Sequence, residues 1–234
     1  MARWAKSGEP GSPPVQAATV IPIRDRAEGM EVLMLRRNSK IAFGGMWVFP
    51  GGRVDPGDQS PSGESDERKT ALRAAVREAR EETGLELPAD SLVAYSHWTP
   101  PPITPKRFLT WFFLAQAPDT EIVIDGGEIH EHAWMRPADA LSRRDGGEIE
   151  LAPPTWVTLH DLSGRGSVAE ALAKAEGEEP ERFETHIAME SDGPTAMWQG
   201  DAGWADGNAD EPGPRHRLQM HGESWTYKRT LEVS

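Results

Sequence analysis

One segment, from Phe49 to Leu85, constrains the fold of this chain more than any other. Its second half has the apolar spacing i, i+3, i+4, i+7 of one helical face, which predicts an amphipathic helix. Gly84 follows that pattern at the position where a left-handed C-cap ends many helices. The predicted apolar stripe consists of Leu72, Ala75, Val76 and Ala79.

Three carboxylates follow one flank of the same predicted helix: Glu78, Glu81 and Glu82. Like charges at this spacing repel by about 0.2–0.5 kcal/mol per pair, and a hard divalent cation with oxygen ligands would relieve the repulsion. The Phe-Pro-Gly-Gly sequence at 49–52 predicts a strand end and a glycine turn that exposes a backbone carbonyl toward the helix. We therefore interpret the cluster as a metal site. The alternative is a solvated acidic face paired with Arg73, Arg77 and Arg80 on the other flank.

The pattern Arg-Glu-x-x-Glu-Glu-x-Gly at 77–84, with Gly52 and the acid Asp58 ahead of it, resembles the Nudix box. Its second half is intact. Its first half departs from the family pattern, because Asp58 replaces the usual glutamate and 18 residues, instead of seven, separate it from the arginine. A register that starts at Gly63 restores both spacings but places Lys69 where the family has a carboxylate, so we reject it.

The extra residues are interpreted as an insertion into the box, from Gln59 to about Lys69, rich in Ser, Asp, Glu and Pro. We expect it to form a surface loop and an added first turn of the helix, with Ser65 as the N-cap. Because such an insertion leaves the helical carboxylates in place, it affects specificity more than chemistry.

The resemblance implies an α+β fold of the Nudix type, an α/β/α sandwich with a mixed β-sheet. We expect residues 15–165 to form this domain with the box at 52–85, preceded by a flexible tail at 1–14 that is rich in Gly and Pro. Residues 166–234 are expected to pack on it as a C-terminal extension. The residue patterns predict strands at 16–23, 30–37, 46–49, 91–98, 107–117, 121–124, 131–135 and 183–189, helices at 137–143, 154–162 and 168–175, and a hairpin at 215–231.

Composition excludes several classes of protein. The net charge of −13 argues against a surface for long nucleic acid. No run approaches the ~18–20 apolar residues of a membrane span. With no cysteine, disulfides and thiolate metal sites are ruled out, and we expect a cytoplasmic protein. A homodimer interface is one role open to the C-terminal extension.

The resemblance also implies the chemistry, which is hydrolysis of a diphosphate linked to another moiety by attack of water at phosphorus, with Mg²⁺ or Mn²⁺. Carried over to this chain, Glu78 and Glu82 are metal ligands one helical turn apart, together with the carbonyl of Gly52. Glu81 completes the site as a ligand through water or as a base. Arg77 pairs with a box carboxylate and holds it in position.

Family members often add an acid from a later loop as a base or an extra ligand. Glu128 and Glu131 are the candidates here, and we prefer Glu128 because it comes first in that loop. A solvated loop carboxylate is the alternative for each. The nearby His130 and His132 have the spacing of an exposed strand edge and are not interpreted as a zinc site.

Substrate identity follows from weaker resemblances. Arg36, Gly45 and the Phe-Pro-Gly-Gly sequence partly match the motif of coenzyme A diphosphatases, whose second arginine falls on Ile41 here. The lengthened box and the sequences at 97–100 and 106–114 are similar to the peroxisomal branch of those enzymes. The expected substrate-binding residues are Arg36, Arg37, Trp98, Lys106 and Arg107, with Lys106 and Arg107 on phosphates and Trp98 or Trp111 on adenine.

Several alternatives stay open. Core packing is the alternative for the tryptophans. Pro100 lies 16 positions after Gly84, where ADP-ribose-preferring enzymes of the family have a proline. We therefore favour a coenzyme A or acyl-coenzyme A substrate, with ADP-ribose or a dinucleotide as the alternative. A nucleotide-binding regulator without catalysis is less favoured, because such domains usually lose box carboxylates.

Overall fold

A computed structural model describes residues 13–38, 45–60, 66–104, 106–124 and 126–230. The predicted N-terminal tail therefore lies largely outside the described residues, and the proposed cap Ser65 lies wholly outside them. The chain divides into two compact units. The box unit contains Val15–His97 and Thr110–Glu181, and the second unit contains 98–109 and 182–230 among the described residues.

A mixed β-sheet organises the box unit. A hairpin that closes at Arg26 and Gly29 joins its two longest strands, and the sheet order runs β3-β2-β1-β6-β5. Two further strands pair outside this path, β4 with β1 and β7 with β2. The strands are β1 (Val15–Arg26), β2 (Gly29–Arg37), β3 (Trp47–Val48), β4 (Gly51–Arg53), β5 (Val93–Thr99), β6 (Phe108–Gln116) and β7 (Ile129–Met135).

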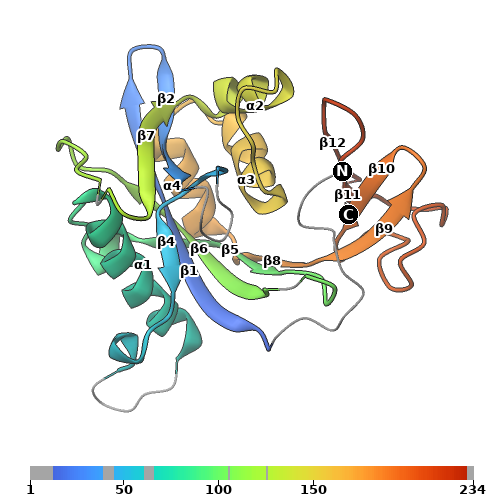
Figure 1. Ribbon diagram of the computed structural model, residues 1–234, viewed down its shortest axis with the longest axis horizontal. Coiled ribbons are helices and arrows are strands. Elements are labelled where there is room, and N and C mark those ends of the chain that lie inside the picture. The colour runs from blue at the N-terminus through green and yellow to red at the C-terminus, as the bar shows by residue number, and fades with distance from the viewer. Residues whose placement is uncertain (1–12, 39–44, 61–65, 105, 125, 231–234) are drawn as a thin grey trace. The chain divides into compact units, whose positions relative to one another are not determined.

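Helix α1 (Glu67–Thr83) packs against β1 and β4, beside which it lies in Figure 1. The side chain of Asp66 accepts a hydrogen bond from the backbone N–H of Lys69, so Asp66 is the N-cap. The buried face is rotated from the predicted stripe, since Leu72 and Val76 are only half-buried. Small side chains let the helix approach the sheet closely; they are Ala71, Ala74, Ala75 and Ala79.

Both faces of the sheet are covered. Ala18 and Val20 pack with the alanines of α1, and the neighbouring Ile21 and Ile23 are equally buried. Contacts from α2 to β2 and from α4 to β1 add helices beyond α1. The remaining helices are α2 (Pro137–Asp145), α3 (Pro153–Ser163) and α4 (Val168–Gly177). The predicted α+β fold with a mixed sheet is thus confirmed. Within the described parts of the chain, no helix is long and apolar enough to cross a membrane.

The second unit contains a four-stranded antiparallel sheet in the order β12-β11-β10-β9. The hairpin predicted at 215–231 is present as β11 and β12. The strand predicted at 183–189 is instead two strands, and β10 was not predicted, because Gly193 and Pro194 at its start do not look like strand residues. The four strands of this sheet are β9 (His186–Glu190), β10 (Gly193–Met197), β11 (His216–Gln219) and β12 (Thr226–Arg229). Strand β8 (Glu181–Glu184) precedes them in the chain and does not belong to this sheet.

A second expected strand, 121–124, does not form. The backbone N–H of Val123 in this segment donates to the carbonyl of Thr83 at 2.9 Å. The segment therefore supplies a hydrogen-bond donor to the last turn of α1 instead of pairing with a neighbouring strand. Its position therefore depends on the helix end, which local alternation of apolar residues does not reveal.

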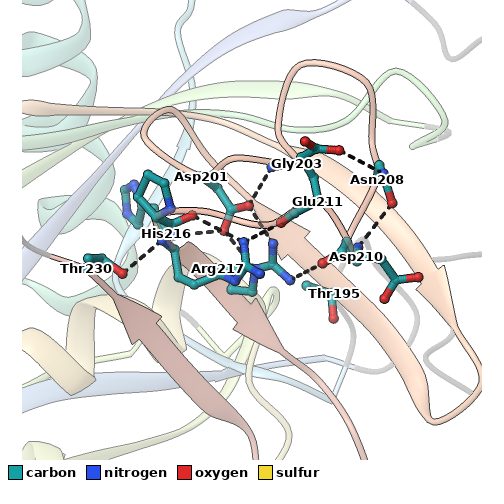
Figure 2. Close-up of polar contacts among 12 residues, drawn as sticks. Thr195, Asp201, Gly203, Asn208, Asp210, Glu211, His216, Arg217 and Thr230 are labelled. Carbon is teal, nitrogen blue, oxygen red and sulfur yellow. Dashed lines mark hydrogen bonds and ion pairs between the residues drawn. The ribbon is translucent and has the colours of Figure 1, made fainter.

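A buried ion pair holds the loop that precedes β11 in the second unit (Figure 2). Arg217 donates from Nε and Nη2 to the two carboxylate oxygens of Asp201 at 2.7 and 2.6 Å. The backbone N–H groups of Gly203 and His216 donate to the same carboxylate, and Arg217 Nη1 donates to the carbonyl of Ala209. Each buried charge is therefore paired and hydrogen-bonded, which is the condition for a stable buried ion pair.

We predict opposite effects for two Gly→Ala substitutions at helix ends. Gly84 has φ +70° at the end of α1, so Gly84→Ala should lower the free energy of unfolding by about 1 kcal/mol. Gly146 ends α2 with φ −73° and has room for a methyl group, so Gly146→Ala should be neutral or slightly stabilising. Urea denaturation of both variants measures the difference. Equal losses of stability would contradict the left-handed cap at Gly84.

Candidate active site

The glycine pair Gly51-Gly52 places the backbone directly against two neighbours. Strand β4 pairs with β1 so that Gly51 lies opposite Thr19 and Gly52 opposite Ala18. A Cβ atom at Gly51 would overlap the backbone of β1, and one at Gly52 would overlap the carboxylate of Glu78. The absence of side chains at both positions therefore lets the strand backbone touch the acids of α1.

Glu82 is the most enclosed of the three glutamates on α1. Its residue is 6% exposed, and its Oε2 accepts a hydrogen bond of 2.8 Å from the backbone N–H of Gly51. Burial raises the pKa of Glu82 to about 8, against the lowering effects of that hydrogen bond and of Arg37. The negative charges of Glu78 and Glu128 raise the same pKa further. Glu82 thus carries unfavourable negative charge that a cation would stabilise.

Glu78 lies one turn before Glu82 on the same side of α1. Burial raises its pKa, while the hydrogen bond and charge of Arg77 lower it, and the net direction is upward. Both carboxylates that were predicted as metal ligands are therefore partly or largely desolvated and electrostatically coupled.

Arg77 is the hub of the acidic cluster. It forms a two-pronged hydrogen bond to Asp58, from Nε to Oδ1 at 3.1 Å and from Nη2 to Oδ2 at 3.0 Å. From Nη1 it donates to Glu78 at 2.9 Å and to Glu81 at 3.0 Å. Its Nη2 also donates to the carbonyl of Arg53 in β4 at 2.9 Å. These acids raise the pKa of Arg77 above its ordinary value, chiefly through Asp58.

Asp58 fills the supporting position despite its shorter side chain. It ends the short 3-10 helix η2 (Pro56–Asp58), and its Oδ2 also accepts from the backbone N–H of Asp55 at 2.8 Å. Burial pushes the pKa of Asp58 upward, but the hydrogen bonds from Arg77 and Asp55 outweigh burial, so the pKa is lowered. The side chain of Arg73 donates to the backbone carbonyl of Asp58 and fixes this turn on α1. The turn therefore brings the shorter side chain of Asp58 within hydrogen-bonding distance of Arg77.

The donors present fit a hard divalent cation. Glu78 offers a desolvated carboxylate beside the backbone of Gly52, and Glu82 offers one that is bonded to the N–H of Gly51. Glu78 and Glu81 both accept hydrogen bonds from Arg77. Among the described residues, no group of three or more His, Asp or Glu side chains is arranged to hold a metal ion.

The two arginines at the end of β2 pair with different acids. Arg36 Nη1 lies 3.3 Å from Glu131 Oε2, with both side chains about half exposed. Arg37 Nη2 lies 2.6 Å from Glu128 Oε2, and the Arg37 side chain is only 17% exposed. Of the two candidate loop acids, Glu128 is the one that acts electrostatically on Glu82. His130 and His132 are exposed on β7.

The other predicted substrate-binding residues belong to the second unit. Trp98 stacks face to face on Phe183 with ring centroids 3.8 Å apart, and Trp198 meets both rings edge-on. One face of Trp98 is thereby covered, which favours the core-packing alternative over contact with adenine. Lys106 is exposed, and Arg107 donates to the carbonyl of Pro100 at 3.3 Å.

Sequence reasoning missed the contacts that hold the box together from its first half. The pairing of Arg77 with Asp58 and with the carbonyl of Arg53 depends on η2, which the spacing alone did not indicate. A usable signal was Pro56-Gly57 just before Asp58, a dipeptide that favours a turn.

Comparisons with known proteins agree with this geometry. A model of the NUDIX domain family matches residues 13–155. A Caenorhabditis elegans protein named "Putative nudix hydrolase 7" is 29% identical over an alignment that covers 56% of this chain and 55% of that protein, so the chain spans about half the length of this relative. The crystal structure of a NUDIX hydrolase from Alicyclobacillus acidocaldarius is similar with a TM-score of 0.62 and 25% identity, covering 69% of this chain and 96% of that one.

The support of Arg77 by Asp58 predicts a stability loss for Asp58→Asn. We expect about 2 kcal/mol at neutral pH, because charged hydrogen bonds to a buried carboxylate are lost. The control Asp55→Asn should change stability by less than about 0.5 kcal/mol, since that carboxylate is 62% exposed and 3.8 Å from Arg77. Because the pKa of Asp58 is lowered by folding, its contribution is present above about pH 4 and is lost as the pH falls below that. Urea denaturation between pH 3 and pH 7 measures the free energy of unfolding of wild type and of Asp58→Asn, and the two curves should converge at the acid end.

The raised pKa of Glu82 predicts the opposite pH dependence for metal-free protein. Between the ordinary value of 4.5 and about 8, the folded state holds a proton that the unfolded state lacks, so stability should fall as the pH rises through this window. Glu82→Gln should abolish the fall and make the protein more stable than wild type at pH 9 by about 5 kcal/mol. Chemical denaturation in EDTA measures this, with exposed Glu86→Gln as the control. Parallel profiles for wild type and Glu82→Gln would refute the assignment.

Proposed function

This chain belongs to the Nudix domain family, and we propose that it hydrolyses a diphosphate linkage in a nucleotide-type substrate with the help of Mg²⁺ or Mn²⁺. Hydrolases of this family generally use divalent cations. The observation that carries the proposal is the pair Glu78 and Glu82, desolvated on one side of α1 with the Gly51-Gly52 backbone packed against them. A regulator that only binds nucleotides is less favoured, because the chain keeps Glu78, Glu81 and Glu82.

In the proposed reaction, the oxygen of water forms a bond to one phosphorus and the bond from that phosphorus to the bridging oxygen breaks, which gives two phosphorylated products. A bound cation would neutralise phosphoryl oxygens and lower the pKa of water. Glu78 and Glu82, with the carbonyl of Gly52, are the groups that would hold it. Glu128 or Glu81 would accept the proton of water, and Arg77 keeps Glu78 and Glu81 in position.

We favour a coenzyme A or acyl-coenzyme A substrate. Arg36 has the chemistry for a phosphate group, because its pairing with Glu131 is a half-exposed surface ion pair that an anionic ligand can replace at little cost. Lys106 is exposed in the second unit and is a further candidate for a substrate phosphate, with Arg107 beside it. ADP-ribose or a dinucleotide is the alternative, supported by Pro100 in the sequence.

Product identification by mass spectrometry tests this function. Protein with Mg²⁺ or Mn²⁺ is offered coenzyme A, acyl-coenzyme A, ADP-ribose, NADH, diadenosine polyphosphates and nucleoside triphosphates. Phosphopantetheine and 3′,5′-ADP from coenzyme A are the expected products. AMP and ribose phosphate from ADP-ribose would instead assign the alternative substrate.

Two matched variants accompany the assay. Glu82→Gln should lower turnover by at least about 100-fold while the protein stays folded, because one proposed metal ligand is lost. Glu86→Gln removes an exposed carboxylate just beyond α1 and should keep wild-type turnover. Nucleotide binding without turnover by the wild type would favour the regulator.

A further inference from the structure

Strands β2 and β7 shift register at the point where they approach the box. Arg36 lies opposite Glu131, but Arg37 lies opposite Ile129, so an additional residue of β7 bulges between these pairs. Bulges of this kind re-aim side chains and are frequent beside active sites. Here the shift leaves Arg36 with an acid of β7, whereas Arg37 pairs with Glu128 in the preceding loop.

The backbone on both sides of this contact is fixed. The N–H of Arg37 donates to the carbonyl of Met46 at 3.1 Å, and its carbonyl accepts from the N–H of Gly45 at 2.9 Å. The N–H of Asn38 donates to the carbonyl of Glu128 at 2.8 Å, and its side chain donates to the carbonyl of Gly127. The end of β2 therefore ties the segment that leads into Gly51-Gly52 to the loop that carries Glu128.

The guanidinium of Arg37 is mostly buried and bonded to an acid of the later loop. Its side chain is 17% exposed, and its Nη2 donates to Glu128 Oε2 at 2.6 Å. Within the described parts of the chain, Arg37 Nε is covered and has no hydrogen-bond partner. A guanidinium in this position is better suited to hold a carboxylate than to capture a substrate from solvent.

We propose that Arg37 is a positioning residue, which holds the carboxylate of Glu128 at the end of β2, and not a substrate-binding residue. The inference rests on the proposed hydrolysis and deepens it. It assigns different work to adjacent arginines. Arg36, about half exposed, would meet the substrate, whereas Arg37 acts through Glu128.

A double-mutant cycle tests this role, with coenzyme A and ADP-ribose as probes in the presence of Mn²⁺. Arg37→Met should lower kcat by about 10–100-fold with little change in KM, because a supporting partner of a reacting group is lost. In the Glu128→Gln background it should have no further effect, since both changes remove the same function. Arg37→Lys should recover part of the loss by restoring the charge.

The comparison variant is Arg36→Met, which should raise KM. Its effect should multiply with the effect of Glu128→Gln in the double mutant. A readout independent of turnover is the ¹⁵N NMR spectrum of arginine side chains. In wild type, the bond to Glu128 should slow rotation of the Arg37 guanidinium group, so that its Nη–H signals are separate. In Glu128→Gln the rotation should be fast and the signals averaged. Circular dichroism verifies folding of each variant.

Three outcomes overturn the inference. A rise in KM alone for Arg37→Met would make Arg37 a substrate contact. Multiplied effects of Arg37→Met and Glu128→Gln would show that the two residues act separately. Absence of turnover by the wild type on both probes and on the wider substrate panel would instead defeat the proposed function itself, and the role of Arg37 with it.

Discussion

The guanidinium of Arg77 is the contact on which the candidate site depends. One planar cation reaches Asp58 on η2, Glu78 and Glu81 on α1, and the backbone of β4. It therefore connects the three segments that must meet for the box to exist. Arginine suits this task because its donors diverge in a fixed plane and its charge persists at any physiological pH. Lysine would offer a single point of charge to partners that lie in several directions.

The acids of the box divide into two groups with different electrostatics. Asp58 is stabilised as an anion, because Arg77 and a backbone N–H more than offset its burial, and its pKa is lowered. Glu82 is destabilised as an anion, because burial dominates and its pKa is raised to about 8. Two carboxylates of the same box thus have opposite electrostatics. Asp58 is stable as an anion within the structure, whereas Glu82 is the one that a bound cation would stabilise.

The insertion into the box leaves this arrangement intact because its two ends are held. At its start, Arg73 and Arg77 bond to Asp58. At its end, Asp66 caps α1, and Glu67 in the first turn accepts a hydrogen bond from the indole of Trp111 at 3.2 Å. Helix α1 begins at Glu67, inside the span assigned to the insertion, and packs on the sheet through its alanines, so the packing of the helix fixes where the carboxylates lie.

The amino-acid sequence by itself determined the box helix with its C-cap, the acids on it and the hairpin of β1 and β2, because these follow from periodicity and local turn chemistry over short spans. The α+β class followed from the resemblance of the box to the Nudix pattern. Only the tertiary structure decided which acid each arginine serves. Arg77 belongs to Asp58, 19 residues away, and Arg37 to Glu128, 91 residues away. The covered face of Trp98 and the buried pair of Asp201 and Arg217 are of the same kind. Partners distant in sequence are selected by burial and charge after the chain has folded, and neither quantity can be read from residue spacing.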